Sequence, residues 1–162
     1  MTDAAFEAAV ERYADMLFRL AYSYLKSRAD AEDVMQETLL KLYTERTDFD
    51  SPEHERYWVV RVAVNESRKV LRSPWRRRTL PLEGWDGAAE EEEPSGVLEA
   101  VLALEGKYRL PVYLYYYEGY SVQEAAAILG LNPSTVQTRL QRAREKLKKA
   151  LTEEGEGDKC SI

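Results

Sequence analysis

Polar side chains near the start of one C-terminal segment have the chemistry to read DNA base edges. Residues 134–151 bury Val136, Leu140, Ala143 and Leu147 at helical spacing. The outward positions carry amide, hydroxyl and guanidinium groups, at Gln137, Thr138, Arg139, Gln141 and Arg142. Such groups pair with base edges in a major groove, and the lysines and arginines that follow can meet phosphates. The segment therefore predicts a helix that binds duplex DNA.

The residues before this helix predict the turn that would present it. Ser121 and Glu124 have the spacing of a capping box, in which each side chain accepts from the other residue's backbone N–H. Gly130 is suited to the left-handed conformation that ends a helix, and Pro133 to the first turn of the next one. Together these signals predict a helix-turn-helix. The alternative is an ordinary helical hairpin with a basic solvated face.

The net charge of −6 argues at first against a nucleic-acid partner, but the excess of acidic over basic residues lies outside the predicted folded parts. Residues 79–96 hold six acidic and no basic residues, and residues 152–162 hold four acidic residues and one lysine. Residues 97–151 hold eight basic against five acidic residues. A chain that is acidic on average can thus carry a basic DNA-binding part.

Apolar periodicity predicts an all-α fold of two small helical domains joined by an acidic flexible linker. The first domain, residues 1–78, has an amphipathic helix, a second helix capped by Asp30 and ending near Glu45, and a third over residues 52–71. The linker is 79–96. The second domain, 97–151, begins at Val97, continues with an apolar helix over 110–117 that Pro111 starts, and ends with the helix-turn-helix. A polar tail, 152–162, follows and is expected to be disordered.

Other functional classes find little support in the composition. No apolar run approaches a membrane span, and the first residues lack the pattern of a signal peptide, so we expect a cytoplasmic protein. Cys160 is the single cysteine, and His54 the single histidine, which we expect to be a surface residue. No metal-spaced cluster or phosphate-cradling glycine loop appears. We expect no metal, no cofactor and no enzymatic activity.

Residues 30–38 resemble the core-binding segment of the extracytoplasmic-function sigma factors. The stretch DAEDVMQET has the acidic, alanine-containing start and the valine-x-glutamine-glutamate motif of that family. The resemblance implies that Asp33, Gln36 and Glu37 touch the clamp coiled-coil in the largest subunit of core RNA polymerase. The alternative is that these acids only compensate the helix dipole, which explains Gln36 and Glu37 less well.

Residues 57–69 resemble the part of the same family that opens the minus-ten promoter element. The stretch YWVVRVAVNESRK matches a tryptophan-x-x-arginine-isoleucine-alanine-x-asparagine pattern. By resemblance, Phe49 and Asn65 capture a base flipped from the non-template strand, and stacking on an aromatic ring would offset the cost of unstacking. The strand-binding residues expected here are Phe49, Asn65, Arg68, Lys69 and Arg72. The alternatives are that Phe49 anchors a loop, Asn65 is a surface amide and Trp58 belongs to the core.

The second domain resembles the region of this family that reads the minus-thirty-five element. By resemblance, Gln137, Thr138, Arg139, Gln141 and Arg142 would face that duplex. The family commonly has lysine or arginine at the position of Gln137, and an amide there suits adenine better. The tyrosines at 113, 115, 116, 117 and 120 are interpreted mostly as core packing.

The resemblance implies a set of macromolecular partners and leaves two rival functions open. The implied partners are promoter DNA, the clamp coiled-coil of core RNA polymerase, the flap of its second-largest subunit, and an anti-sigma factor. A homodimeric transcription factor would leave residues 30–38 unexplained. A sigma mimic that sequesters an anti-sigma factor would have no use for Asn65 or Arg68.

Overall fold

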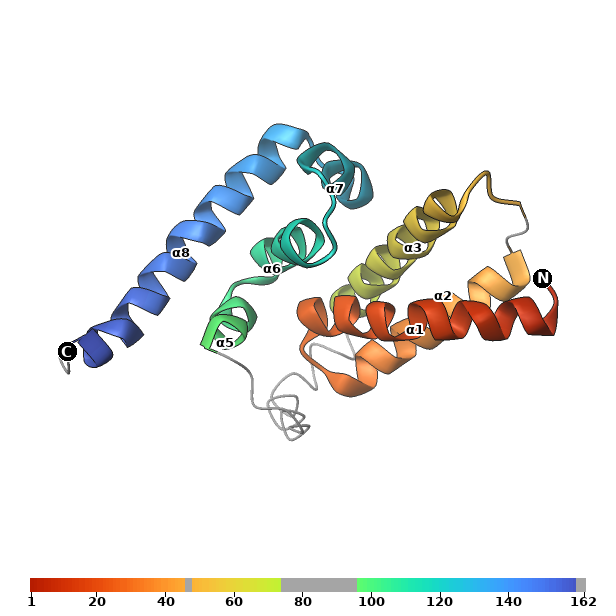
Figure 1. The fold of residues 1–162 in the computed structure, drawn as a ribbon, viewed down its shortest axis with the longest axis horizontal. Coiled ribbons are helices and arrows are strands. Elements are labelled where there is room, and N and C mark those ends of the chain that lie inside the picture. The colour runs from red at the N-terminus through yellow and green to blue at the C-terminus, as the bar shows by residue number, and fades with distance from the viewer. Residues whose placement is uncertain (46–47, 74–95, 160–162) are drawn as a thin grey trace. The chain divides into compact units, whose positions relative to one another are not determined.

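A computed structural model describes residues 1–45, 48–73 and 96–159 of the chain, and all regular structure in these ranges is helical (Figure 1). The chain divides into two compact units, Met1–Ala89 and Glu90–Ile162. The predicted all-α class is confirmed. Residues 79–95 of the predicted linker lie outside the described residues. No helix in the described ranges is long and apolar enough to cross a membrane.

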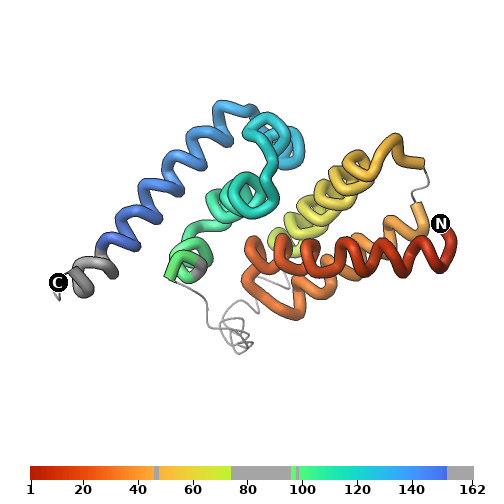
Figure 2. Tube along the Cα trace, in the orientation of Figure 1, coloured from red at the N-terminus to blue at the C-terminus, as the bar shows by residue number. Residues whose placement is uncertain are grey.

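The described residues of the first unit, 1–45 and 48–73, form three helices: α1 (Asp3–Leu25), α2 (Arg28–Glu45) and α3 (Pro52–Arg72). Each pair of these helices is in contact, and their paths can be followed in the red-to-yellow part of Figure 2. Each helix contributes fully buried aliphatic side chains to one core, among them Leu17, Leu20, Val34, Leu42, Val59 and Val64. The apolar periodicity of the sequence thus reports one buried stripe on each helix.

The start of α2 differs from the prediction that Asp30 caps this helix. The Asp30 N–H donates to the Ser27 hydroxyl over 3.2 Å, and the Ala31 N–H donates to the Ser27 carbonyl over 2.9 Å. Ser27 is therefore the capping residue, and Asp30 lies in the first turn. A carboxylate at that position still favours the helix because it faces the positive end of the helix dipole.

Where the structure describes the second unit, over residues 96–159, there are five helical segments: α5 (Gly96–Ala103), α6 (Gly106–Val112), the π-helical segment η2 (Tyr113–Tyr117), α7 (Val122–Leu129) and α8 (Pro133–Lys159). α5, α6 and α7 each pack on α8. Their shared core contains Val101, Leu110, Leu114, Ile128, Val136 and Leu140. α8 is thereby supported along one side by three other elements.

The sequence predicted that Pro111 starts the helix before the helix-turn-helix, and this prediction is wrong. α6 begins at Gly106, so Pro111 lies inside the helix and cannot donate a backbone hydrogen bond to the preceding turn. The chain then widens into η2, where the Glu118 N–H donates to the Tyr113 carbonyl over 3.0 Å. That five-residue spacing is the π-helical pattern.

The last helix is longer than the sequence predicted. α8 continues to Lys159, beyond the expected end at Leu151 and into the tail expected to be disordered. Val136, Leu140 and Ala143 are buried as predicted, whereas Leu147 is half-buried. The apolar face of α8 therefore weakens after about three turns, while the helix itself goes on.

Candidate nucleic-acid and polymerase interfaces

The turn between α7 and α8 has the geometry that the sequence predicted. The Ser121 hydroxyl accepts from the Glu124 N–H over 3.0 Å, and the Glu124 carboxylate accepts from the Ser121 N–H over 2.9 Å. Gly130 ends α7 with a φ of 70°. The Asn132 carbonyl then accepts from the Thr135 and Val136 N–H groups to start α8. These contacts confirm a helix-turn-helix whose second helix is α8.

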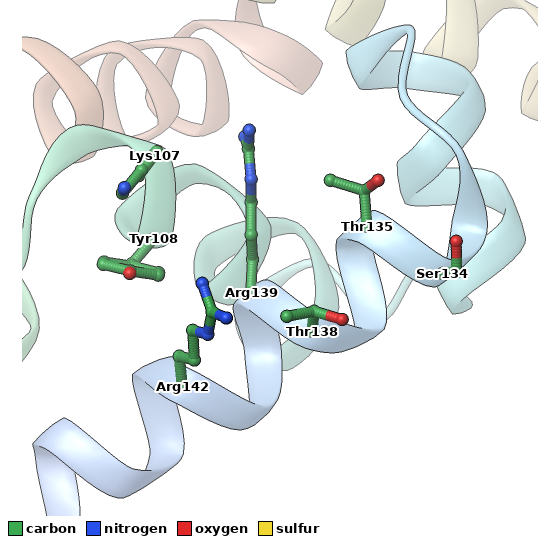
Figure 3. Close-up of a pocket in the computed structure, with 7 residues that line it drawn as sticks. All are labelled: Lys107, Tyr108, Ser134, Thr135, Thr138, Arg139 and Arg142. Carbon is green, nitrogen blue, oxygen red and sulfur yellow. The ribbon is translucent and has the colours of Figure 1, made fainter.

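The five residues predicted to face duplex DNA occupy two sides of α8. Gln137, Thr138, Gln141 and Arg142 are exposed, and Arg139 is half-buried. Since each residue turns the helix by roughly 100°, Gln137, Thr138 and Gln141 lie away from the buried Val136–Leu140 side. Arg139 and Arg142 line a pocket against α6, and Thr138 lies at the edge between this pocket and the outward face (Figure 3). The outward amides and hydroxyl can approach base edges, and the arginines flank them.

Sequence reasoning missed two residues of α6 that share this pocket. Lys107 and Tyr108 line it together with Thr138, Arg139 and Arg142 of α8. The two segments are about thirty residues apart in the chain, so no local spacing could have joined them. Only the packing of α6 on α8 brings them together.

A polar and basic face runs along α3 on the side opposite its core. Asn65, Lys69 and Arg72 are exposed and Arg68 is half-buried, whereas Val59, Ala63 and Val64 are fully buried. Trp58 and Asn65 are seven residues apart, which places them on the same side of the helix about 10 Å apart along its axis. The four residues predicted from α3 thus share one accessible surface.

Phe49 is held in place by aromatic neighbours at the start of α3. Its ring centroid lies 5.3 Å from that of His54 and 5.8 Å from that of Trp58, both edge to face. The His54 Nδ1 accepts from the Asp50 N–H over 3.1 Å. His54 is exposed, as expected, but it also supports the loop that carries Phe49.

An open pocket of about 670 Å³ lies beside Phe49. It is lined by Arg12, Phe49, Asp50, Ser51, Pro52 and Glu55, and Asn65 is not among its lining residues. The structure therefore places Phe49 and Asn65 on neighbouring parts of one surface and does not join them in one pocket. A strand that used both would have to run along the exposed side of α3.

Beneath this pocket, three side chains connect α1 to the first turn of α3. Both the Tyr13 hydroxyl and the Arg12 guanidinium donate to the same Glu55 oxygen, over 2.7 Å and 2.9 Å. Burial, together with the hydrogen bond to Glu55, raises the pKa of Tyr13 to about 12. Sequence reasoning missed this cluster, because Glu55 is more than forty residues from Tyr13.

The exposed face of α2 carries the residues expected to contact polymerase. Asp33, Gln36 and Glu37 are exposed, and Leu40 continues their helical spacing with 53% of its surface exposed. A single exposed leucine is ordinary on a protein surface, so Leu40 is a candidate contact only because it shares this side of α2 with Asp33, Gln36 and Glu37. Leu40 could have been found from the sequence, because it lies seven residues after Asp33 and therefore on the same side of the helix.

The tyrosines around η2 divide between core and surface. Tyr113 is buried and Tyr115 and Tyr120 are half-buried, but Tyr116 and Tyr117 are about half exposed. The Tyr116 hydroxyl accepts from the Arg144 guanidinium over 2.9 Å. The interpretation of most of these tyrosines as packing thus fails for Tyr116 and Tyr117.

Among the described residues, no group of three His, Cys, Asp or Glu side chains could hold a metal ion.

Comparisons with known proteins agree with this arrangement. Residues 9–77 match the family model for Sigma-70 region 2, and residues 96–147 match that for Sigma-70 region 4. RNA polymerase sigma factor SigV of Bacillus subtilis is 28% identical, over 94% of this chain and 95% of its own length. ECF RNA polymerase sigma factor SigW of the same organism is 31% identical, over 91% of this chain and 89% of its own length.

Two solved structures share the fold. The sigma factor RpoE from Bartonella quintana, solved in complex with the anti-sigma factor NepR, has a TM-score of 0.69 at 24% identity, covering 91% of this chain and 97% of its own. CnrH, solved in complex with the cytosolic domain of CnrY, has a TM-score of 0.65 at 27% identity, covering 94% of this chain and 90% of its own. With both regions present in order, the chain belongs to the extracytoplasmic-function sigma factors, which direct promoter recognition and transcription initiation by RNA polymerase.

Proposed function

We propose that this sigma factor divides promoter recognition between α8, which reads the minus-thirty-five duplex, and the Phe49–α3 surface, which holds the opened minus-ten strand. The observation that carries this division is that each unit has its own exposed polar face opposite a fully buried core. The face of α8 offers amides, a hydroxyl and arginines on a helix-turn-helix. The face of α3 offers Asn65 and basic side chains beside an aromatic ring.

Captured bases fit the α3 surface for a physical reason. Extruding a base costs a few kcal/mol of stacking and pairing. Stacking of one base on Phe49 and hydrogen bonds from the Asn65 amide to another part of the same strand would offset that cost. The nearby cations Arg68, Lys69 and Arg72 would hold the strand's phosphates. Phe49 also anchors its loop through His54 and Trp58, and this packing pre-positions the ring.

The test uses the full chain assembled with core RNA polymerase on a linear promoter duplex. Asn65→Ala is expected to lower open-complex formation about tenfold, measured by permanganate reactivity of unpaired thymines, with little change in initial binding. Arg142→Ala is expected to weaken initial duplex binding and flatten its salt dependence. Equal losses in initial binding for both variants, with normal melting, would contradict the division.

For polymerase binding, we propose that Asp33, Gln36, Glu37 and Leu40 of α2 contact the clamp coiled-coil of the largest subunit, and that the second unit meets the flap of the second-largest one. Leu40 adds an apolar side chain at the C-terminal end of this polar stripe, where an interface with polymerase would bury it. Leu40→Ser should lower the affinity for core polymerase about tenfold in a binding titration. Glu32→Gln is the control, because Glu32 is also exposed on α2 but faces Arg28 at 3.8 Å.

Regulation by an anti-sigma factor is also proposed, and support comes from RpoE of Bartonella quintana, which was solved with such a partner. The chain itself acts by binding and not by catalysis, since polymerase supplies the chemistry of transcription. A purified candidate anti-sigma factor should abolish transcription by the reconstituted enzyme. If core polymerase added in excess does not restore transcription, the two partners do not compete for the same sigma surface.

A further inference from the structure

The pocket between α6 and α8 has the chemistry of an anion-binding site. Figure 3 shows Lys107 and Tyr108 on one side and the side chains of α8 on the other, with Arg142 directed toward Tyr108. The pocket encloses about 320 Å³ and is lined by Lys107, Tyr108, Ser134, Thr135, Thr138, Arg139 and Arg142. Three of these side chains are cations, four carry hydroxyls and none is a carboxylate. Such a lining favours a negatively charged group.

Tyr108 contacts two lysines, Lys107 of the pocket lining and Lys146 of α8. Its ring is buried, with the Lys107 ammonium 5.3 Å and the Lys146 ammonium 5.6 Å from the ring centroid. Cation–π attraction keeps both charges over the ring and leaves their other hydrogen-bond donors available. Lys107 also pairs with an acid, Glu105, whose carboxylate lies 4.0 Å from the Lys107 Nζ with both side chains more than half exposed. Such a solvated pair competes only weakly.

The place of this pocket on α8 indicates which anion it receives. Gln137, Thr138 and Gln141 face away from the core, and Arg139 and Arg142 lie between that face and α6. When a helix lies in a major groove, its flanks meet the sugar-phosphate backbones that border the groove. The cations are therefore next to the base-reading face, on the side where a backbone would pass.

We propose that Lys107, with Arg139 and Arg142, forms a binding site for one backbone phosphate of the promoter duplex. This inference rests on the proposed reading of duplex DNA by α8 and deepens it. It adds a contact from α6, outside the helix-turn-helix. A phosphate contact fixes register and affinity and carries no sequence information itself, so its loss weakens binding to all promoter sequences alike.

The first experiment measures how binding of the reconstituted holoenzyme to promoter duplex depends on salt. Lys107→Gln should weaken binding roughly fivefold and reduce the slope of log affinity against log salt concentration by about one. Lys107→Arg keeps the charge and should keep the slope. Arg19→Gln is the matched control, because Arg19 is an exposed cation of α1 paired with Asp15 at 2.7 Å and lies in the other unit.

The second experiment locates the phosphate. Single phosphates along the minus-thirty-five duplex are replaced, one at a time, by neutral methylphosphonates, and each duplex is titrated with wild-type and K107Q holoenzyme. At one phosphate position, and at most at its neighbours, the losses of binding free energy from the methylphosphonate and from Lys107→Gln should not be additive, since each change removes the same contact. Additive effects at every position, or an unchanged salt slope in K107Q, would overturn the phosphate site.

Two controls separate the alternatives. If inorganic pyrophosphate binds the full chain through Lys107 while promoter binding does not depend on this lysine, the pocket serves a free anion and the DNA site is overturned. If the wild-type holoenzyme fails to bind and open the promoter, the proposed function itself fails, together with this inference. Normal promoter opening by both wild type and K107Q with equal salt slopes would overturn only the inference.

Discussion

At the scale of single residues, Glu66 of α3 links its helix to α2 through Lys41. Its carboxylate accepts from Lys41 over 2.9 Å and from Lys69 over 3.2 Å, and only 12% of its side chain is exposed. Burial by itself raises the pKa of Glu66, but the hydrogen bonds from Lys41 and Lys69 outweigh burial and lower it below 4.5. The ion pair is therefore stronger than an exposed one.

We predict that Glu66→Gln lowers the free energy of unfolding by about 1 kcal/mol at pH 7. The pKa of Glu66 is lower in the folded protein than in the unfolded chain, so between these two values the unfolded chain binds more protons. The stability that Glu66 contributes is therefore lost as the pH falls from 4.5 through the folded pKa. Urea unfolding of both proteins at several pH values between 7 and 3 measures the difference. The gap between them should narrow with acid, whereas a constant gap, or an equal loss in Glu32→Gln, would contradict this role.

For Tyr13 we predict a loss of stability at alkaline pH, opposite to the acid dependence of Glu66. Burial and the hydrogen bond to Glu55 raise its pKa from 10.0 to about 12, so the stability it contributes is complete below pH 10 and is lost as the pH rises toward 12. Tyr13→Phe should cost about 1 kcal/mol at pH 7. In unfolding experiments, wild type should lose this advantage between pH 10 and 12. Tyr117→Phe, at an exposed tyrosine, is the control and should leave the stability at pH 7 unchanged.

At the scale of the elements, the turn before α8 depends on the conformation of Gly130. Its φ is 70°, and a Cβ added there would meet no atom within 4 Å. The cost of a side chain is therefore conformational and not steric, and Gly130→Ala should destabilise by about 1 kcal/mol. Asn tolerates this conformation better, so Gly130→Asn should cost less. Thermal unfolding followed by circular dichroism ranks the three proteins, and equal losses for Ala and Asn would refute the explanation.

Which elements could be predicted depended on how local their signals are. The capping box at Ser121, the turn at Gly130 and the helix over Pro52–Arg72 were predictable, because each depends on residues a few positions apart. The start of α2 was not, because Ser27 and Asp30 are both good caps. The site residues that were missed, Lys107 and Glu55, come together with their partners only through packing between helices. Periodicity identifies the buried side of a helix but not its neighbours.

At the scale of the whole molecule, the distribution of charge is itself a prediction about the free protein. The acidic residues of 79–96 have no basic neighbours in that segment, and four glutamates stand together at 90–93. These residues lie outside the described part of the chain. Their composition nevertheless suits a mimic of nucleic-acid charge that keeps the unbound sigma factor off DNA.

Replacing the four glutamates at 90–93 by glutamine should therefore raise binding of the free full chain to promoter duplex, measured by fluorescence anisotropy at low salt. The matched control neutralises the four tail acids, Glu153, Glu154, Glu156 and Asp158, which changes the net charge from −6 to the same −2. Masking by the linker requires the first variant to bind more tightly than the second. Equal gains would assign the effect to net charge alone, through long-range repulsion of DNA, and no gain in either would leave the acidic segment without a role in the free protein.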